Sequence, residues 1–396
     1  MNVLFCANYP FNPKYGGVGR VTDLLTKGLI TLDKEYNIFY LTPKVIDRDM
    51  LNYNFPAKVY ELPEIGNYGI KENNNFLLKI IEENNIDIVI NQEGSFLKEI
   101  DFLCEVRKKC KVISVLHTGV DSLITHSYYE HKNSKRRGIK SAVKKIILPL
   151  LKSKIERVVK SRLFTHYTHL ASVSDAIVLL SPSYVPQMKE YIIEGDAKIT
   201  SIPNPNTFKV AEINPEEKEN IVLFVGRLSQ IEKNPLRLLQ IWRRIYKKYL
   251  DWRLVIVGDG ADKELLQHYI EKHHICNVSL EGAKSNVEDY YRRASIVCLT
   301  SNYEGWGMAL TEGMTFGCVP FTFGNYGAAY DIIDDGGNGY VIPAFDTNQY
   351  AKKLSEIMED RDRRVLMTQA AQRKVQNFSI ENVALKWDEL FKSLLK

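Results

Sequence analysis

The segment Leu299-Thr-Ser-Asn-Tyr-Glu-Gly-Trp-Gly-Met-Ala-Leu-Thr-Glu312 contains the pattern that decides the fold. A short apolar run leads into a glycine-rich turn, and a helical pattern begins near Met308. A strand followed by a glycine turn and a helix is the repeating unit of a doubly wound parallel sheet. The first N–H groups of such a helix are unpaired and carry partial positive charge. Two carboxylates, Glu304 and Glu312, flank the helix start and can accept hydrogen bonds from hydroxyl groups.

The same alternation extends outward over the whole chain in two series. The strands expected in the first series are Val3–Ala7, Ile38–Thr42, Ile86–Asn91, Val112–His117 and Leu170–Ser174. Those expected in the second are Ile221–Gly226, Arg253–Gly258, Val278–Gly282, Ile296–Thr300, Val319–Phe323 and Tyr340–Pro343. Strands that alternate with helices predict parallel sheets covered on both faces.

The second series restarts near residue 220, after a proline-containing and charged stretch that is typical of a linker. We therefore predict an α/β fold of two Rossmann-like doubly wound domains, over residues 1–205 and 218–377. Ligands of such sheets bind beyond the carboxyl ends of the strands, so we expect these ends to face an interdomain cleft. A last amphipathic helix is expected at about Glu381–Leu395, with Ser379 as its N-cap.

Length and composition indicate an ordinary globular protein. The chain has 396 residues, of which 45% are hydrophobic and 26% charged. No stretch approaches the roughly 20 apolar residues of a membrane-spanning helix, and the first residues read as a strand. We therefore expect a cytoplasmic protein. The six cysteines are scattered without a C-x-x-C pair, and no His/Cys cluster has zinc-ligand spacing, so we expect buried reduced thiols and no metal.

Basic residues are concentrated in one segment. Residues 131–162 carry +11 of a chain whose net charge is +5, so the remainder carries −6. Basic groups alternate there with the apolar cluster Ile146–Leu151, as in helices that lie on anionic membranes. A peripheral position on the inner face of the cell membrane and a solvated helix that covers the first sheet both stay open. Nucleic-acid binding is disfavoured, because no base-reading module is present.

Several side chains follow expected strands and thus lie at the edge where ligands bind. Gly16 and Gly17 occupy the first strand-to-helix turn, where a backbone can approach an anion closely. His117 ends the fourth expected strand of the first series. Arg227 follows the first strand of the second series, and Lys233 precedes the next helix. Two fixed cations at a strand-to-helix junction suit a diphosphate.

With these residues collected, the chain resembles glycosyltransferase family 4, whose members are retaining enzymes of the GT-B fold. The strongest signature is E-x7-E, met by Glu304 and Glu312. The supporting matches are the Gly16-Gly17 loop, His117, Gly226-Arg227, Lys233-Asn234, Gly258-Asp-Gly260 and the closing segment 377–381. The resemblance implies an N-terminal acceptor domain, a C-terminal donor domain and a last helix, 378–396, that crosses back to the first domain.

The resemblance also implies roles for the residues that match. Arg227 and Lys233 would bind the donor pyrophosphate and stabilise the leaving nucleotide. Glu312 would hold the ribose hydroxyls, and Glu304 would contact the sugar hydroxyls. No metal is required by this scheme, because fixed cations and a helix start already oppose the negative charge.

Further contacts to the donor follow from the same resemblance. The backbone N–H groups of Met308, Ala309 and Leu310 would touch the phosphate or the sugar. Gly17 would approach the pyrophosphate from the N-terminal domain, and His117 would contact the transferred sugar. The segment Gly282-Ala283 would line the base.

The function implied is transfer of a sugar from a nucleotide donor, UDP-hexose or UDP-HexNAc, to a glycan or lipid-linked acceptor of a bacterial surface polysaccharide, lipopolysaccharide or capsule. Alternatives on the same fold are a nucleotide-sugar epimerase and a non-catalytic nucleotide- or glycan-binding relative. The chain departs from the family pattern at Asn204-Pro-Asn-Thr207, at 324–331 and at Glu312-Gly-Met314. These departures leave the identity of the sugar open.

Overall fold

The computed structural model describes residues 1–14, 16–94, 100–133 and 139–396. The chain forms two compact units. The first comprises Met1–Val120, Val159–Thr207 and Phe378–Lys396, and the second comprises Asp121–Val158 and Phe208–Asn377. The long helix α5 (Ile139–Val173) therefore contributes to both, and α4 (Ser122–Lys132) belongs to the second. No helix in the described ranges is long and apolar enough to cross a membrane.

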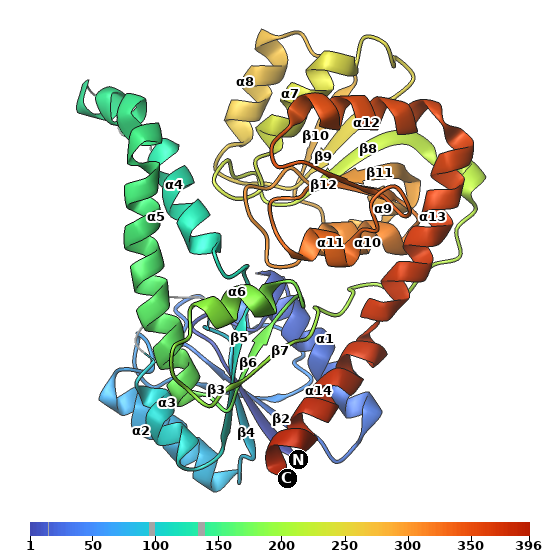
Figure 1. Cartoon of the computed structure of the whole chain (residues 1–396). Coiled ribbons are helices and arrows are strands. Elements are labelled where there is room, and N and C mark those ends of the chain that lie inside the picture. The colour runs from blue at the N-terminus through green and yellow to red at the C-terminus, as the bar shows by residue number, and fades with distance from the viewer. Residues whose placement is uncertain (15, 95–99, 134–138) are drawn as a thin grey trace. The chain divides into compact units, whose positions relative to one another are not determined.

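The first unit is built on a seven-stranded parallel sheet with the order β3-β2-β1-β4-β5-β6-β7. Its strands are β1 (Asn2–Cys6), β2 (Asn37–Thr42), β3 (Lys58–Glu61), β4 (Ile88–Asn91), β5 (Lys111–Leu116), β6 (Ala176–Leu179) and β7 (Lys198–Ser201). Its other helices are α1 (Gly17–Leu32), η1 (Arg48–Leu51), α2 (Lys71–Glu83), α3 (Phe102–Arg107), α6 (Tyr184–Glu190) and α14 (Ile380–Leu395). Helices α1 and α14 cover one face of the sheet, and α2, α3 and the end of α5 cover the other (Figure 1).

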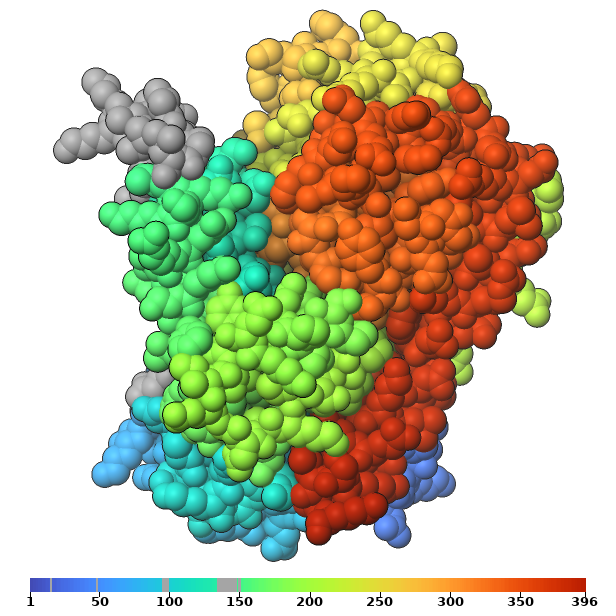
Figure 2. All heavy atoms as spheres, viewed as in Figure 1, coloured from blue at the N-terminus to red at the C-terminus, as the bar shows by residue number. Residues whose placement is uncertain are grey.

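The second unit contains a six-stranded parallel sheet with the order β10-β9-β8-β11-β12-β13. Its strands are β8 (Glu219–Val225), β9 (Arg253–Val257), β10 (Val278–Gly282), β11 (Ala294–Cys298), β12 (Val319–Phe323) and β13 (Tyr340–Ile342). Its other helical segments are η2 (Pro215–Glu217), α7 (Pro235–Ile245), α8 (Lys263–Lys272), α9 (Glu288–Arg293), α10 (Met308–Thr315), α11 (Ala328–Ile332), α12 (Thr347–Glu359), α13 (Arg361–Val375) and η3 (Gln376–Phe378). Residues 300–375, coloured orange to red, form much of the face of this unit seen in Figure 2.

The predicted fold, two doubly wound α/β domains, agrees with these sheets, but individual strands differ. The run Leu170–Ser174 is not a strand, because α5 continues to Val173 and the strand β6 starts only at Ala176. The edge strands β3 and β7 were not predicted, since their residues are half-buried and mixed in polarity. The predicted last helix and its cap are confirmed, because the Ser379 side chain accepts a hydrogen bond from the Asn382 N–H.

The expectation of buried cysteines holds for only part of the set. All six thiols are free, and Cys6, Cys298 and Cys318 are buried. Cys104 and Cys276 are exposed, because each lies on a solvated helix or turn and not in a strand.

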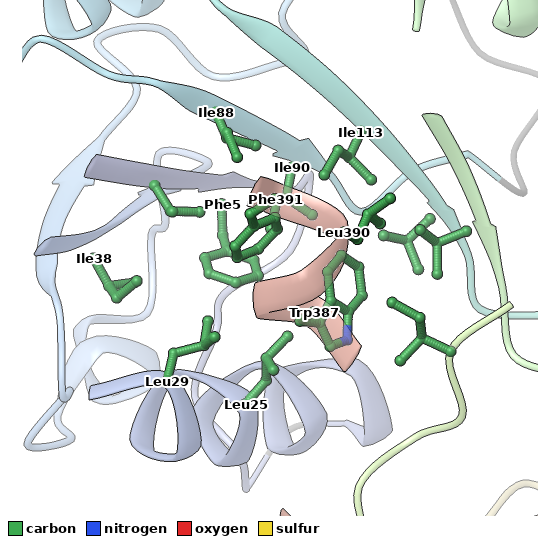
Figure 3. Packing of buried hydrophobic residues seen from close by; sticks show 14 of the residues in the cluster. Phe5, Leu25, Leu29, Ile38, Ile88, Ile90, Ile113, Trp387, Leu390 and Phe391 are labelled. Carbon is green, nitrogen blue, oxygen red and sulfur yellow. The ribbon is translucent and has the colours of Figure 1, made fainter. Parts of the chain in front are cut away.

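Helix α14 completes the core of the first unit, although it is the last element of the chain. Its Trp387, Leu390 and Phe391 lie among side chains of α1 and of strands β1, β2, β4 and β5 (Figure 3). The close approach of α14 to α1 depends on Gly28, since a Cβ there would lie 2.7 Å from Cγ2 of Ile380. A glycine at this position thus lets the last helix pack into the first unit.

This packing predicts a large effect of truncating Phe391, which has no exposed surface. Phe391→Ala is expected to lower the free energy of unfolding of the first unit by about 3–5 kcal/mol, because it removes contacts and leaves a cavity. Urea unfolding followed by circular dichroism measures the change. Leu395→Ala, on the same helix at a side chain 43% exposed, is the control and should cost less than about 0.5 kcal/mol. Equal effects of the two substitutions would contradict the packing described.

Candidate functional site

The second sheet has a point at which its connections diverge. Strand β8 pairs with β9 on one side and with β11 on the other, so the loops after β8 and β11 turn to opposite faces of the sheet. In open parallel sheets, ligands bind outside the carboxyl ends of the strands at such a point. The loop after β8 carries Arg227 and Lys233, and the loop after β11 carries Glu304. The topology therefore brings these predicted residues to one edge of the sheet.

Lys233 and Glu304 form an ion pair at this edge. The Lys233 Nζ lies 2.7 and 2.8 Å from the two carboxylate oxygens of Glu304. The Glu304 side chain is only 7% exposed, and it also accepts a hydrogen bond from the Ser301 Oγ at 2.6 Å. A carboxylate and an ammonium group are thus fixed side by side where ligands of this fold bind.

The local backbone holds Lys233 at the start of α7. Asn234 adopts the left-handed conformation with a φ of 44°, which asparagine tolerates better than most residues. Pro235 occupies the first turn of α7, where its missing N–H and fixed φ are favourable. The Thr300 Oγ1 donates to the Asn234 carbonyl at 3.0 Å, which ties this turn to the loop after β11.

A buried polar network, which the sequence reasoning missed, joins the two loops. Asn302 donates through its Nδ2 to the carbonyls of Gln230 and Ile231, and its backbone N–H donates to the Glu232 carbonyl. Arg237, on α7, donates to the Asn302 Oδ1 and to the Thr300 carbonyl, both at 2.7 Å. The sequence feature that could have indicated this role is the position of Asn302, two residues after the predicted strand Ile296–Thr300.

Arg227 lies in a more open position than Lys233. Its side chain is 63% exposed, and its NH1 lies 3.1 Å from a carboxylate oxygen of Glu232 on the same turn. The structure therefore places Arg227 at the predicted edge of the sheet, with an acidic partner of its own.

The start of α10 and the second acid of the E-x7-E pattern also lie after β11. Gly307 precedes the helix with a φ of 101°, a conformation that favours glycine, and no side chain caps the helix. Met308 and Ala309 are half-buried and Leu310 is buried, so the first turn is only partly covered. Glu312 is 3% exposed and accepts a hydrogen bond from the Tyr291 hydroxyl at 2.9 Å.

Three further glycines of the second unit, Gly258, Gly260 and Gly282, lie at or just after the ends of strands. A Cβ on Gly258 would lie 1.9 Å from the Gly226 carbonyl oxygen, and one on Gly260 would lie 2.5 Å from the Leu228 carbonyl oxygen. The Gly258-Asp-Gly260 turn is thus explained by its close packing on the turn after β8. Gly282 ends β10 with a φ of 72°, and the following Ala283 is exposed.

The first sheet has its own point of divergence, between β1 and β4. Gly16 and Gly17 follow β1 at the start of α1, and a Cβ on either would meet no described atom within 4 Å. Gly19 differs, because a Cβ there would lie 3.0 Å from the Asn12 carbonyl oxygen. Packing therefore explains Gly19 but not Gly16 and Gly17.

His117, directly after β5, is held by a chain of hydrogen bonds. Its Nε2 bonds to the Oε1 of Gln92, whose Nε2 donates to the Thr22 Oγ1 at 3.1 Å, and that hydroxyl donates to the Val18 carbonyl. This direction of donation places the proton of a neutral His117 ring on Nε2 and leaves Nδ1 as an acceptor. Burial lowers the pKa of His117 from 6.5 to about 4, so the ring is neutral near pH 7.

Comparison with known sequences identifies the second unit. Residues 206–374 match the sequence model of the family described as glycosyl transferases group 1. This segment therefore resembles the group 1 glycosyltransferases. The predicted resemblance to glycosyltransferases is therefore confirmed.

Two curated proteins that are similar to the chain are named as glycosyltransferases. The chain is 31% identical to the amylovoran biosynthesis glycosyltransferase AmsD of Erwinia amylovora over 174 residues. The aligned region covers 44% of this chain and 48% of AmsD. The chain is also 31% identical over 175 residues, with the same coverage, to a Campylobacter jejuni enzyme. That enzyme is named GalNAc-α-(1→4)-GalNAc-α-(1→3)-diNAcBac-PP-undecaprenol α-1,4-N-acetyl-D-galactosaminyltransferase. The chain spans about half the length of these two relatives.

Solved glycosyltransferase structures match over nearly the whole chain. Anabaena HepE in complex with UDP and glucose has a TM-score of 0.72 at 15% identity, over 99% of this chain and 100% of HepE. A Staphylococcus aureus TarM mutant in complex with fondaparinux, α-GlcNAc-glycerol and UDP has a TM-score of 0.70 at 15% identity. The match covers 98% of this chain and 99% of the TarM chain. At such identity these matches establish the fold, and the predicted GT-B class is confirmed.

The ion pair of the group 1 domain predicts a coupling between Lys233 and Glu304. Lys233→Met is expected to lower the free energy of unfolding by about 1–3 kcal/mol, because it leaves the buried Glu304 carboxylate without its cation. Adding Glu304→Gln should regain part of this loss, as a double-mutant cycle by urea unfolding would measure. Lys248→Met, which breaks an exposed pair with Glu359, is the control and should cost less than about 1 kcal/mol. No recovery in the double variant would contradict the pairing.

The lowered pKa of His117 predicts a pH dependence of stability. A neutral histidine in the folded state stabilises the fold fully above its unfolded pKa of 6.5, and this contribution is lost as the pH falls toward about 4. His117→Gln should therefore flatten the fall of the urea midpoint between pH 6.5 and pH 4. An NMR titration in which the His117 ring protonates near pH 6.5 would refute the prediction.

Proposed function

We propose that the chain is a retaining glycosyltransferase, which transfers a hexose or N-acetylhexosamine from a UDP donor to a glycan or lipid-linked acceptor. The observation that carries the proposal is the Lys233–Glu304 pair at the point of divergence of the second sheet, beside the start of α10. Cations and a helix start suit the donor diphosphate, and a carboxylate suits the sugar hydroxyls.

The chemistry follows from the charges that develop during transfer. Breaking the bond from the anomeric carbon leaves negative charge on the nucleotide diphosphate, which Lys233, Arg227 and the N–H groups of Met308 and Ala309 would stabilise. Binding of the diphosphate would draw Lys233 from Glu304 and free that carboxylate to accept hydrogen bonds from the sugar. This scheme uses side chains and backbone of the chain and requires no metal.

Retention is proposed to proceed on one face of the sugar through an oxocarbenium-like ion pair. Retaining glycosidases instead form a covalent intermediate on a carboxylate. Glu304 lies at this edge of the sheet, and its two oxygens are engaged by Lys233 and Ser301. A sugar trapped covalently on Glu304 would contradict the proposed route. The roles expected of Gly17, His117, Glu312 and Gly282-Ala283 toward the donor remain predictions.

The names and bound ligands of similar proteins support the proposed classes of donor and acceptor. HepE was solved with UDP and glucose, and the TarM mutant with UDP. The C. jejuni relative is named for a substrate linked to undecaprenol through a diphosphate, and AmsD for the biosynthesis of amylovoran. We therefore propose an acceptor that belongs to a bacterial surface polysaccharide.

A lipid-linked acceptor would agree with contact to an anionic membrane through residues 131–162. Residues 134–138 of this segment lie outside the described residues. In the described part of α5, Lys152, Lys154, Arg157 and Lys160 are exposed, whereas Leu148 is 2% exposed. We propose that any such contact is electrostatic, through the exposed cations, and that Leu148 belongs to the interior.

Donor binding predicts a specific thermal shift. UDP in a buffer with excess EDTA should raise the melting temperature, because a ligand that binds only the folded state stabilises it. Arg227→Ala should abolish most of this shift. Arg253→Ala is the control, because Arg253 is a similarly exposed cation, paired with Glu219 at the opposite end of the sheet. A UDP shift that is absent, or that Arg227→Ala leaves unchanged, would refute the proposed donor site.

A transferase and an epimerase differ in what they do to a UDP-sugar that is supplied without an acceptor. A transferase should leave most of a UDP-sugar unchanged until an acceptor is added, whereas an epimerase would convert it alone. Mass spectrometry and NMR of the sugar nucleotide separate the two. Epimerisation without an acceptor would favour the alternative function.

Membrane contact predicts binding to anionic vesicles that is sensitive to salt. Sedimentation with vesicles of phosphatidylglycerol and phosphatidylcholine should decline steeply from 50 to 500 mM salt. Replacing Lys152 and Lys154 by glutamine should weaken binding by about tenfold or more, at about 1 kcal/mol for each cation. The same change at Lys79 and Lys108, two exposed cations of the first unit, is the control. Equal effects of the two double variants would contradict the assignment.

A further inference from the structure

The residues Arg227, Lys233 and Glu304 are called the candidate donor site below. The second unit has a cavity at the opposite edge of the same sheet. Its volume is about 360 Å³. Lys218 lies just before β8, Trp252 lies just before β9, and Arg361 and Arg364 lie in the first turn of α13 (Figure 1). The cavity is therefore lined from the amino ends of strands, whereas Arg227, Lys233 and Glu304 follow carboxyl ends. It forms no part of the site described above.

The lining of this cavity carries an excess of positive charge. Three lining residues are cations, Lys218, Arg361 and Arg364, and one is a carboxylate, Asp251. Asp251 accepts a hydrogen bond from the Asn220 Nδ2 at 2.8 Å, and Arg361 pairs with Glu216. The lining residues alone thus carry a formal charge of +2, and the carboxylates of Glu216 and Asp360 lie near the two arginines.

Lys218 and Arg364 are held by neutral groups. The Lys218 Nζ donates to the carbonyls of Tyr291 and Ala294, at 2.9 and 2.7 Å, and to the Cys318 Sγ at 3.8 Å, so each of its three N–H groups has a partner. The Arg364 NH1 donates to two carbonyls at the end of α12, and its guanidinium lies 5.0 Å from the centre of the Trp252 ring. Neither cation forms an ion pair with a carboxylate of the described residues.

Burial lowers the pKa of Lys218 and also that of Arg364, because partly buried charge is poorly solvated. Carbonyl oxygens satisfy the N–H donors but supply no net negative charge. A bound anion would offset the charge, and an arginine fork beside a lysine matches the oxygens of a phosphate.

The size of the cavity indicates more than an inorganic ion. A single water needs roughly 10–15 Å³ of such volume, and small-molecule pockets begin at about 300 Å³. Asn220 and Asp251, which already hydrogen-bond each other, can also bind hydroxyl groups. The cavity therefore combines enough volume for a small molecule with cations and with polar groups that can bind hydroxyls.

We propose that this cavity binds a phosphate monoester of a sugar or polyol, with Arg361 and Arg364 receiving the phosphate, Lys218 adding its positive charge, and Asn220 and Asp251 binding the hydroxyls. The proposal does not depend on the proposed transferase activity. Because β8 and β11 run from this edge to the candidate donor site, the ligand would bind to the same sheet as the donor, at its other end.

Isothermal titration calorimetry with glucose 6-phosphate tests the proposal, with inorganic phosphate and glucose as separate titrants. We expect millimolar or tighter binding of glucose 6-phosphate, weaker binding of inorganic phosphate, and no binding of glucose. Inorganic phosphate that binds as tightly as the ester would overturn the assignment of an ester. The absence of glucose 6-phosphate binding up to 10 mM would overturn the proposal altogether.

Variants locate the binding. Arg364→Gln should weaken it by about tenfold or more, because it removes charge-assisted hydrogen bonds. Arg361→Gln, at a side chain 58% exposed, should weaken it by about threefold and keeps the test valid if Arg364→Gln folds poorly. Arg253→Gln, a cation at the same edge that does not line the cavity, is the matched control and should bind normally. Binding lost in Arg227→Ala but kept in Arg364→Gln and Arg361→Gln would assign the anion to the candidate donor site and refute the proposal.

Discussion

The adjacency of β8 and β11 is the constraint on which the candidate donor site depends. Parallel pairing places the ends of both strands at one edge, and the chain leaves them toward opposite faces of the sheet. Lys233 and Glu304 are 71 residues apart in sequence and meet only because of this pairing. Each member lowers the cost of burying the other, since an isolated charge at this position would be poorly solvated. The same strands begin at the amino edge, where Lys218 and its neighbours line a different cavity.

The loops that carry the pair are held by polar groups more than by apolar packing. Asn302 is 2% exposed and binds three consecutive carbonyls of residues 230–232 through its side chain and backbone. Arg237 holds Asn302 from α7, and Asn325 donates to the carbonyls of Ser301 and Asn302. Buried networks of this kind favour one geometry, because other arrangements would break these hydrogen bonds and leave more buried groups unpaired. The site is thus held in place before any ligand binds.

The sequence pattern was sufficient to predict the fold class. It was also sufficient to predict the edge of each sheet at which the candidate residues lie. Short apolar runs marked most central strands, and the helix start at Met308 was placed correctly. Prediction failed where tertiary context decides. Leu170–Ser174 is apolar because the end of α5 packs on a sheet, and β3 and β7 are half-buried edge strands with weak patterns. The pairing of Lys233 with Glu304, and the roles of Gln92, Arg237 and Asn302, depend on contacts between distant segments that no local pattern specifies.

The placement of α14 has a consequence for the order in which the protein can be assembled during synthesis. Trp387 and Phe391 belong to the core that Phe5 and Leu29 begin, so that core stays open until the final helix has left the ribosome. The second sheet, by contrast, is complete in sequence once residue 342 has been made. Domains usually fold in the order in which they are synthesised. Here the synthesis of the first unit begins before that of the second sheet and is completed only after it, so the apolar face that α14 covers stays uncovered for the whole interval.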